Sequence, residues 1–149
     1  MKKAILLAAL AVAATSLTTA AAAMPSGKQS SRATVTAHAS RFGKVLFDGS
    51  GRVLYLFKRD RGSHSSCSGA CATAWPPFLT RRAPKAGAGV RTSLLGTTKR
   101  ANGKLQVTYA GHPLYYFSGD TKPGRINCQN VVEFGGRWLV ISPTGKAIR

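Results

Sequence analysis

The chain has 149 residues, of which 22 are Lys or Arg and four are Asp or Glu, so its formal net charge at pH 7 is +18. A balance this basic favours anionic partners, with an association that weakens as salt is added. Four carboxylates and three histidines leave little for hydrolytic catalysis, and the sequence contains no nucleophile elbow or phosphate-binding loop. We therefore expect a binding protein rather than an enzyme, working without a cofactor.

The first 23 residues have the pattern of a secretory signal peptide. Lys2 and Lys3 precede an apolar run over 4–17, and residues 21–23 offer an A-x-A cleavage pattern. The apolar run is shorter than the ~20 residues of a membrane span. Removal of this leader takes two lysines and leaves a net charge of +16 on residues 24–149. No Cys follows the cleavage site, so we expect a periplasmic or secreted protein without a lipid anchor.

Export directs the basic charge toward anionic polymers of the cell envelope or extracellular DNA. It argues against chromosomal DNA, and we expect no specific nucleic-acid recognition. The alternative is a basic, solubilising surface with no dedicated partner, because net charge alone bears on solubility and non-specific binding.

The expected elements then follow in chain order. Residues 24–32 are small, polar and without pattern, which predicts a disordered lead-in, and 33–149 is long enough for a single domain. The only expected helix spans Cys67–Trp75 and is stopped by Pro76-Pro77. Residues 81–91 are expected to be a basic surface linker. Strands are expected at 33–38, 44–47, 52–58, 93–100, 104–109, around Tyr115 and at 137–142, with turns at 48–51, 101–103 and 110–111 and a long loop at 120–130.

The strand at 52–58 is apolar on both faces. Val53, Tyr55 and Phe57 point to one side, and Leu54 and Leu56 point to the other. Such a strand is expected to be covered on both sides.

The stretch Tyr55–Asp60 recurs 60 positions later as Tyr115–Asp120. Self-similarity at a fixed period indicates two copies of one supersecondary unit. We expect a mainly β fold of two pseudo-equivalent antiparallel meanders, residues 33–77 and 93–142, that share one core. This register aligns identical residues in the two copies: Gly43, Lys44, Gly51 and Leu54 with Gly103, Lys104, Gly111 and Leu114. It also aligns Val45 and Phe47 with Leu105 and Val107. After the motif the spacing drifts slightly, and Cys67 and Trp75 correspond to Cys128 and Trp138.

These residues resemble a known family of exported bacterial repeat proteins, described as predicted lipoproteins of unknown function. The family is defined by a Tyr-x-(Phe/Trp/Tyr)-x-x-Asp motif, which both copies match. Cys67-x-x-x-Cys71 followed by Trp75-Pro76-Pro77 is also similar to the family. The resemblance implies an exported two-repeat protein. Two features depart from the pattern: the lipid-accepting Cys is absent, and Cys128 stands where a small or polar residue is expected.

The motif residues have structural and functional interpretations. Tyr55, Phe57, Tyr115 and Phe117 are expected in the core, with each phenol bonded to a buried acceptor, and the alternative is a stacking face for a ring-shaped ligand. The carboxylates at Asp60 and Asp120 are expected to accept backbone N–H bonds in their loops. The alternative is a proton-sharing dyad, although neither Asp lies in an Asp-Thr/Ser-Gly context.

Three cysteines in an exported protein suggest one disulfide and one remaining thiol. Cys67 and Cys71 on one helical turn would place their Cα atoms ~6 Å apart, so we expect this pair to form the disulfide and Cys128 to be free. Because Cys67 and Cys128 are equivalent in the repeat, a Cys67–Cys128 bridge is the alternative pairing. The alternative function is redox or metal handling by His64, Cys67, Cys71, Cys128 and His112.

Overall fold

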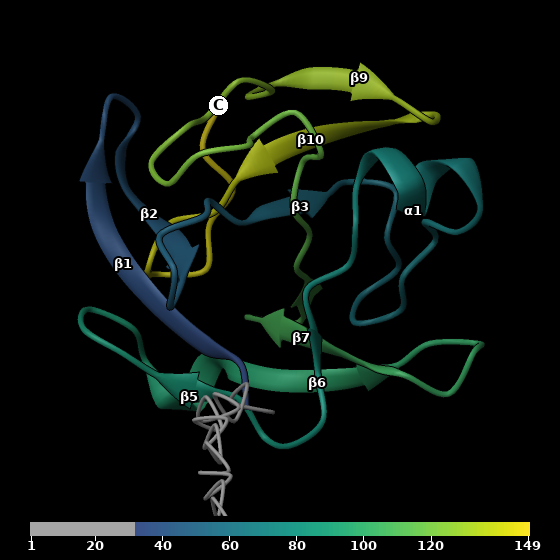
Figure 1. Ribbon diagram of the computed structural model, residues 1–149, viewed down its shortest axis with the longest axis horizontal. Helices are drawn as coiled ribbons and strands as arrows, with labels where there is room; N and C mark the ends of the chain where they lie inside the picture. The colour runs from purple at the N-terminus through teal and green to yellow at the C-terminus, as the bar shows by residue number, and fades with distance from the viewer. Residues whose placement is uncertain (1–31) are drawn as a thin grey trace, which may run out of the picture.

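The computed structural model describes residues 32–149 (Figure 1), so the predicted signal peptide and almost all of the predicted lead-in lie outside the described residues. None of the helices in residues 32–149 is both long and apolar enough to cross a membrane. The elements are β1 Thr34–Ser40, β2 Gly43–Asp48, β3 Tyr55–Phe57, α1 Ala70–Ala74, β4 Leu79–Thr80, β5 Lys85–Ala86, the 3-10 helix η1 Thr92–Leu94, β6 Leu95–Lys99, β7 Leu105–Tyr109, β8 His112–Pro113, β9 Val131–Glu133 and β10 Gly136–Val140.

The predicted mainly β, two-repeat fold is confirmed. Each repeat opens with an antiparallel hairpin, β1–β2 in the first and β6–β7 in the second. Three small sheets result, with strand orders β2-β1-β5, β3-β10-β9 and β4-β7-β6, and β8 pairs with β7. In Figure 1, β9 and β10 lie along the top of the view and β6 and β7 along the bottom.

The two repeats exchange their closing segments. β10 of the second repeat pairs with β3 of the first, so that Trp138 lies opposite Phe57. In the other half, the Tyr116 N–H donates to the Pro76 carbonyl at 2.8 Å, and β4 pairs with β7. Each repeat therefore completes the strand pairing of the other.

Tyr55 and Tyr115 lie at the pseudo-twofold centre of this arrangement. Each tyrosine N–H donates to the carbonyl of the other at 2.9 Å. The two motif segments are thus joined antiparallel at equivalent residues, and the local symmetry of the duplication passes between them.

In the hairpin strands before the turn, equivalent residues of the two repeats are 61 positions apart rather than 60. Leu54 N–H donates to the Leu46 carbonyl, whereas Leu114 N–H donates to the Val107 carbonyl, so Leu46 matches Val107. The predicted match of Phe47 with Val107 is therefore wrong by one residue. The first repeat has three residues between Asp48 and Arg52, and the second has only Ala110 and Gly111, both at positive φ, between Tyr109 and His112. A two-residue turn of this kind is typical of a tight hairpin.

The two faces of the central strands carry separate apolar clusters, as the pattern at 52–58 predicts. Tyr55 and Phe57 lie in the cluster that contains Trp75 and Trp138, which we call the aromatic cluster. Leu54 and Leu56 lie in a second cluster. The second repeat divides in the same way, with Tyr115 and the partly buried Phe117 in the aromatic cluster and Leu114 and Tyr116 in the second cluster.

Several elements differ from the sequence-based prediction. β4 was not predicted, and the strand predicted around Tyr115 is replaced by isolated bridges of Tyr115 to Tyr55 and Pro77. The helix begins at Ala70 rather than Cys67. The predicted linker at 81–91 contains β5, which pairs in parallel with the start of β1. The sequence pattern also missed β9, a three-residue strand whose Val131 is partly buried and whose Val132 faces solvent and is 62% exposed.

Candidate functional site

The two motif tyrosines donate across the repeat boundary to the two motif aspartates. Tyr55 Oη donates to Asp120 Oδ2 at 2.6 Å, and Tyr115 Oη donates to Asp60 Oδ2 at 2.8 Å. Each bond joins the tyrosine of one repeat to the aspartate of the other. We call these contacts the crossed Tyr–Asp pairs.

The second oxygen of each carboxylate accepts a loop N–H, as predicted. Asp60 Oδ1 accepts from Ser66 N at 2.8 Å and Asp120 Oδ1 accepts from Asn127 N at 3.0 Å. Both donors directly precede a cysteine, Cys67 or Cys128, so the two loops use equivalent residues. Each aspartate therefore fixes its own loop and holds the other repeat.

Burial is the main cause of the shifted pKa values of Tyr55, Tyr115 and Asp60. Both tyrosines are fully buried, and burial together with the adjacent carboxylates raises the pKa of Tyr55 and Tyr115 well above the ordinary value. Burial also raises the pKa of Asp60, against the hydrogen bonds from Ser66 and Tyr115 and the charge of Arg100, which lower it. The phenols consequently remain neutral donors throughout the physiological range.

Beside the pairs, three aromatic rings form a continuous stack, and a fourth packs against it at a tilt of 42°. Trp75 and Trp138 stack with ring centroids 4.0 Å apart and planes within 5°. Phe57 stacks on the outer face of Trp138 at 4.0 Å, and Phe117 packs on Trp75 at 4.8 Å. Tyr55 meets the edge of Trp75, and Tyr115 meets that of Trp138.

Because both tryptophans are completely buried, this stack is core. The predicted core role of the motif aromatics therefore fits the structure better than a face for a ring-shaped ligand. The two tryptophans were recognised as equivalent from the sequence, but their direct contact was not predicted. That contact depends on the exchange of closing segments.

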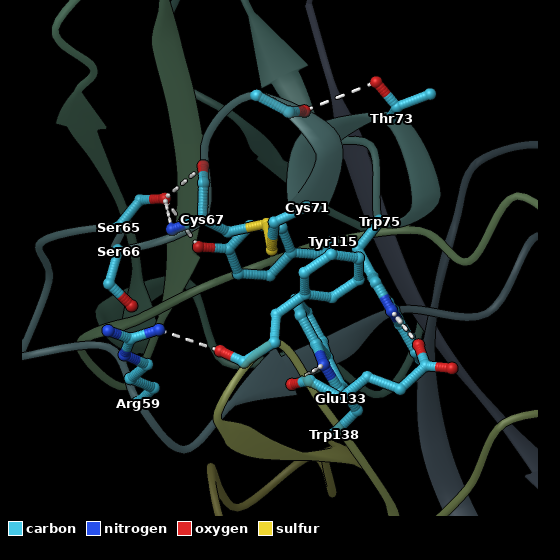
Figure 2. The surroundings of a disulfide bond; sticks show 12 residues. Arg59, Ser65, Ser66, Cys67, Cys71, Thr73, Trp75, Tyr115, Glu133 and Trp138 are labelled. Atoms are coloured by element: carbon cyan, nitrogen blue, oxygen red, sulfur yellow. Dashed lines mark hydrogen bonds between the residues drawn. A yellow bond between two sulfur atoms is a disulfide. The ribbon is translucent and has the colours of Figure 1, made fainter.

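The predicted disulfide joins Cys67 and Cys71, with Cα atoms 5.3 Å apart. Figure 2 shows it with the rings of the aromatic cluster, to which both cysteines belong. Because α1 begins after Cys67, the pair does not lie on one helical turn, and the geometric reason given from the sequence is wrong although the pairing is right. Arg100 of the second repeat donates to the Cys67 carbonyl and fixes this loop.

Cys128 is a free thiol, as predicted, and is partly buried against the aromatic cluster. Burial raises its pKa, with smaller contributions from Glu133 and Asp120. A Cys67–Cys128 bridge does not form, because Cys67 is already bonded to Cys71.

The redox or metal-handling alternative finds no support. The disulfide occupies the sulfurs of Cys67 and Cys71. Within residues 32–149, no group of three His, Cys, Asp or Glu side chains is arranged to hold a metal ion. His64 is exposed in its loop, and His112 is half-buried in β8 with its pKa lowered mainly by burial and also by Lys58.

The proton-sharing dyad is likewise unsupported, because each motif carboxylate is bonded to the phenol of the other repeat and to an N–H of its own loop. Sequence reasoning also missed Glu133, whose Oε2 accepts from Trp75 Nε1 at 2.9 Å (Figure 2). No local pattern indicates that bond, since the two residues are 58 positions apart.

A separate open groove is lined by residues of both repeats. We call it the inter-repeat groove. Its walls are the start of β1, the turn after Asp48, β4 with Arg81, the turn at 103–105, and Tyr116.

Comparison with known proteins gives one match. A family model described as a secreted repeat of unknown function matches residues 36–78 and 96–142. No curated protein and no solved structure was found to match the chain. The two matched segments coincide with the two repeats of the fold and together cover more than half of the chain, and each contains one complete Tyr-x-Phe-x-x-Asp motif. The protein therefore belongs to this family of secreted repeat proteins.

Proposed function

We propose that this protein is an exported, non-catalytic binding domain whose basic surface adheres to anionic polymers outside the cytoplasm. The proposal rests on a difference between the environments of the acidic and the basic side chains. Each carboxylate accepts hydrogen bonds from the protein's own backbone or side chains, whereas most of the basic side chains are exposed to solvent.

All four carboxylates of the chain accept internal hydrogen bonds. Besides Asp60, Asp120 and Glu133, Asp48 accepts from the backbone of Ser50 and Arg52 through Oδ1. Its Oδ2 accepts from Tyr116 Oη at 2.8 Å. The acidic side chains are thus placed for structural roles rather than to neutralise the surface.

The basic side chains are placed differently. Every Lys and Arg in residues 32–149 is exposed except Arg52 and Arg100, which are half-buried. A field of one sign raises the local concentration of polyanions and speeds encounter with them. A non-catalytic role fits the same arrangement, because the buried hydroxyls and carboxylates of the motif already satisfy one another.

The proposal is tested by binding of the secreted protein to immobilised heparin, polyphosphate and uncharged dextran. We expect retention on both polyanions at low salt and release as the ionic strength rises. The reason is that screening shortens from about 10 Å at 0.1 M to about 3 Å at 1 M. Binding that is indifferent to salt, or equal on dextran, would show that charge is not the driving term.

A further inference from the structure

The inter-repeat groove combines an apolar wall with a cationic rim. Leu79 at the start of β4 is 37% exposed, although it is a large apolar side chain. Phe78 and Tyr116 lie beside it in the lining and pack edge to face, with ring centroids 5.3 Å apart. Apolar and aromatic walls of this kind are typical of ligand sites.

Two exposed cations lie at one end of that wall. Arg81 follows β4, and Lys104 lies on the turn before β7; both are exposed and both line the groove. The Arg52 guanidinium lies 4.1 Å from the centre of the Tyr116 ring. Thr80 pairs with Leu105 in the β4–β7 register, so Arg81 and Lys104 lie next to each other and can bind the acidic groups of a ligand that lies along the apolar wall.

A single carboxylate is fixed among these cations. Asp48 is 9% exposed, lines the groove, and is held by Tyr116, Ser50 and Arg52. A fixed negative charge repels a densely charged polyphosphate more strongly than it repels a polysaccharide with one carboxylate per sugar ring. Thr34 also belongs to the lining and has a hydroxyl that suits a hydroxylated ligand, whereas the hydroxyls of Ser50 and Thr80 already donate to Asp48 and to the Arg82 carbonyl.

The internal duplication serves as a comparison for these positions. Asp48 matches Tyr109 in hairpin register, and Tyr116 matches Leu56. Tyr109 and Leu56 are both completely buried in the second cluster. The fold therefore accepts plain core residues at both positions, and the Tyr116–Asp48 pair is a feature of the groove rather than a requirement of the repeat.

We propose that the inter-repeat groove binds an acidic polysaccharide. Sugar rings pack on Leu79 and Tyr116, while Arg81 and Lys104 bind the carboxylates of the chain. This inference rests on the proposed function, and it names the site and the ligand class.

The test uses polygalacturonate as the probe, with binding measured by calorimetry on the secreted protein. Leu79→Asp places a carboxylate on an exposed side chain of the groove and is expected to weaken binding about tenfold or more. Val132→Asp is the matched control, since Val132 is exposed on another strand and the change in net charge is the same. A second pair compares Arg81→Ala/Lys104→Ala with Lys146→Ala/Arg149→Ala, which removes the same charge from exposed residues outside the groove. Thermal melting verifies that all variants fold.

The inference holds if both groove variants lose binding and both controls keep it within about threefold. Equal losses in groove and control variants would overturn the groove while leaving the proposed function standing. Groove-dependent binding of polyphosphate as tight as that of polygalacturonate would overturn the choice of a polysaccharide. Failure of the parent protein to bind any polyanion would instead refute the proposed function itself.

Discussion

Replacing Asp120 with alanine is expected to be one of the most damaging single changes to a polar residue in this fold. Asp120 is 2% exposed and accepts from Tyr55 Oη at 2.6 Å and Asn127 N at 3.0 Å. Tyr55 is fully buried, so its hydroxyl would be stranded at a cost of about 1–3 kcal/mol. Asn127 is exposed, and water can replace part of its bond. We therefore expect Asp120→Ala to lower the free energy of unfolding by about 2–4 kcal/mol, a large share of a typical 5–15 kcal/mol.

Asp60→Ala provides the matched comparison in the other repeat. The Tyr115 hydroxyl also lies 2.7 Å from Ser65 Oγ and keeps this partner when Asp60 is removed. The expected loss is therefore smaller, about 1–3 kcal/mol. Urea denaturation of both variants measures the difference, and Asp120→Ala/Tyr55→Phe should recover part of the stability by removing the stranded donor. An unchanged midpoint for Asp120→Ala, or a larger loss for Asp60→Ala, would refute this reasoning.

Two further predictions follow from the buried phenols and the cysteines. Because the pKa values of Tyr55, Tyr115 and Tyr116 are raised in the folded state, the stability that they contribute is full below about pH 10 and is lost as the pH rises above it. In an alkaline titration, the tyrosinate absorbance should therefore increase over the same pH range in which the circular dichroism signal of the fold is lost. Ionisation of these phenols while the circular dichroism stays native would contradict the account. Replacing both disulfide cysteines with serine should lower the free energy of unfolding by roughly 1–2 kcal/mol, because the closed loop is short. Non-reducing peptide maps should show only this crosslink, and alkylation of Cys128 should be slow because burial raises its pKa; a crosslink to Cys128 would contradict the structure.

The sequence predicts the duplication and the division of the core well. The alternation at 52–58 is sufficient to assign Tyr55 and Leu54 to opposite covered faces, because successive side chains of a strand point to opposite sides. The structure places them in separate clusters as expected. The disulfide also follows from the small number of cysteines and the predicted export signal.

The partners of the motif residues could not be predicted in the same way. A repeat identifies Tyr55 with Tyr115 and Asp60 with Asp120, but it does not say which repeat supplies each partner. A bond within one repeat and a bond across the two repeats satisfy the same local rules. Only the exchange of closing segments, set by long-range pairing of β3 with β10, decides between them.

The offset in hairpin register has a similar origin. The glycines of the turns align at a period of 60, and this alignment hides the extra residue between Asp48 and Arg52. A shift of one residue exchanges the faces of a strand. The structure reveals the offset, because Leu46 and Val107 lie in the same cluster and the carbonyl of each accepts a hydrogen bond from the N–H of an equivalent leucine.

A double-mutant cycle tests the crossed Tyr–Asp pairs most directly. Tyr55→Phe and Asp120→Asn are made singly and together, and free energies of unfolding are measured in urea. Because these side chains are bonded across the repeats, we expect a coupling energy of about 0.5–3 kcal/mol. The control cycle joins Tyr55→Phe with Asp60→Asn, which share no hydrogen bond in the described residues, and should be additive within about 0.5 kcal/mol. Coupling of Tyr55 with Asp60 and additivity with Asp120 would show that each repeat satisfies its own motif and would contradict the crossed arrangement.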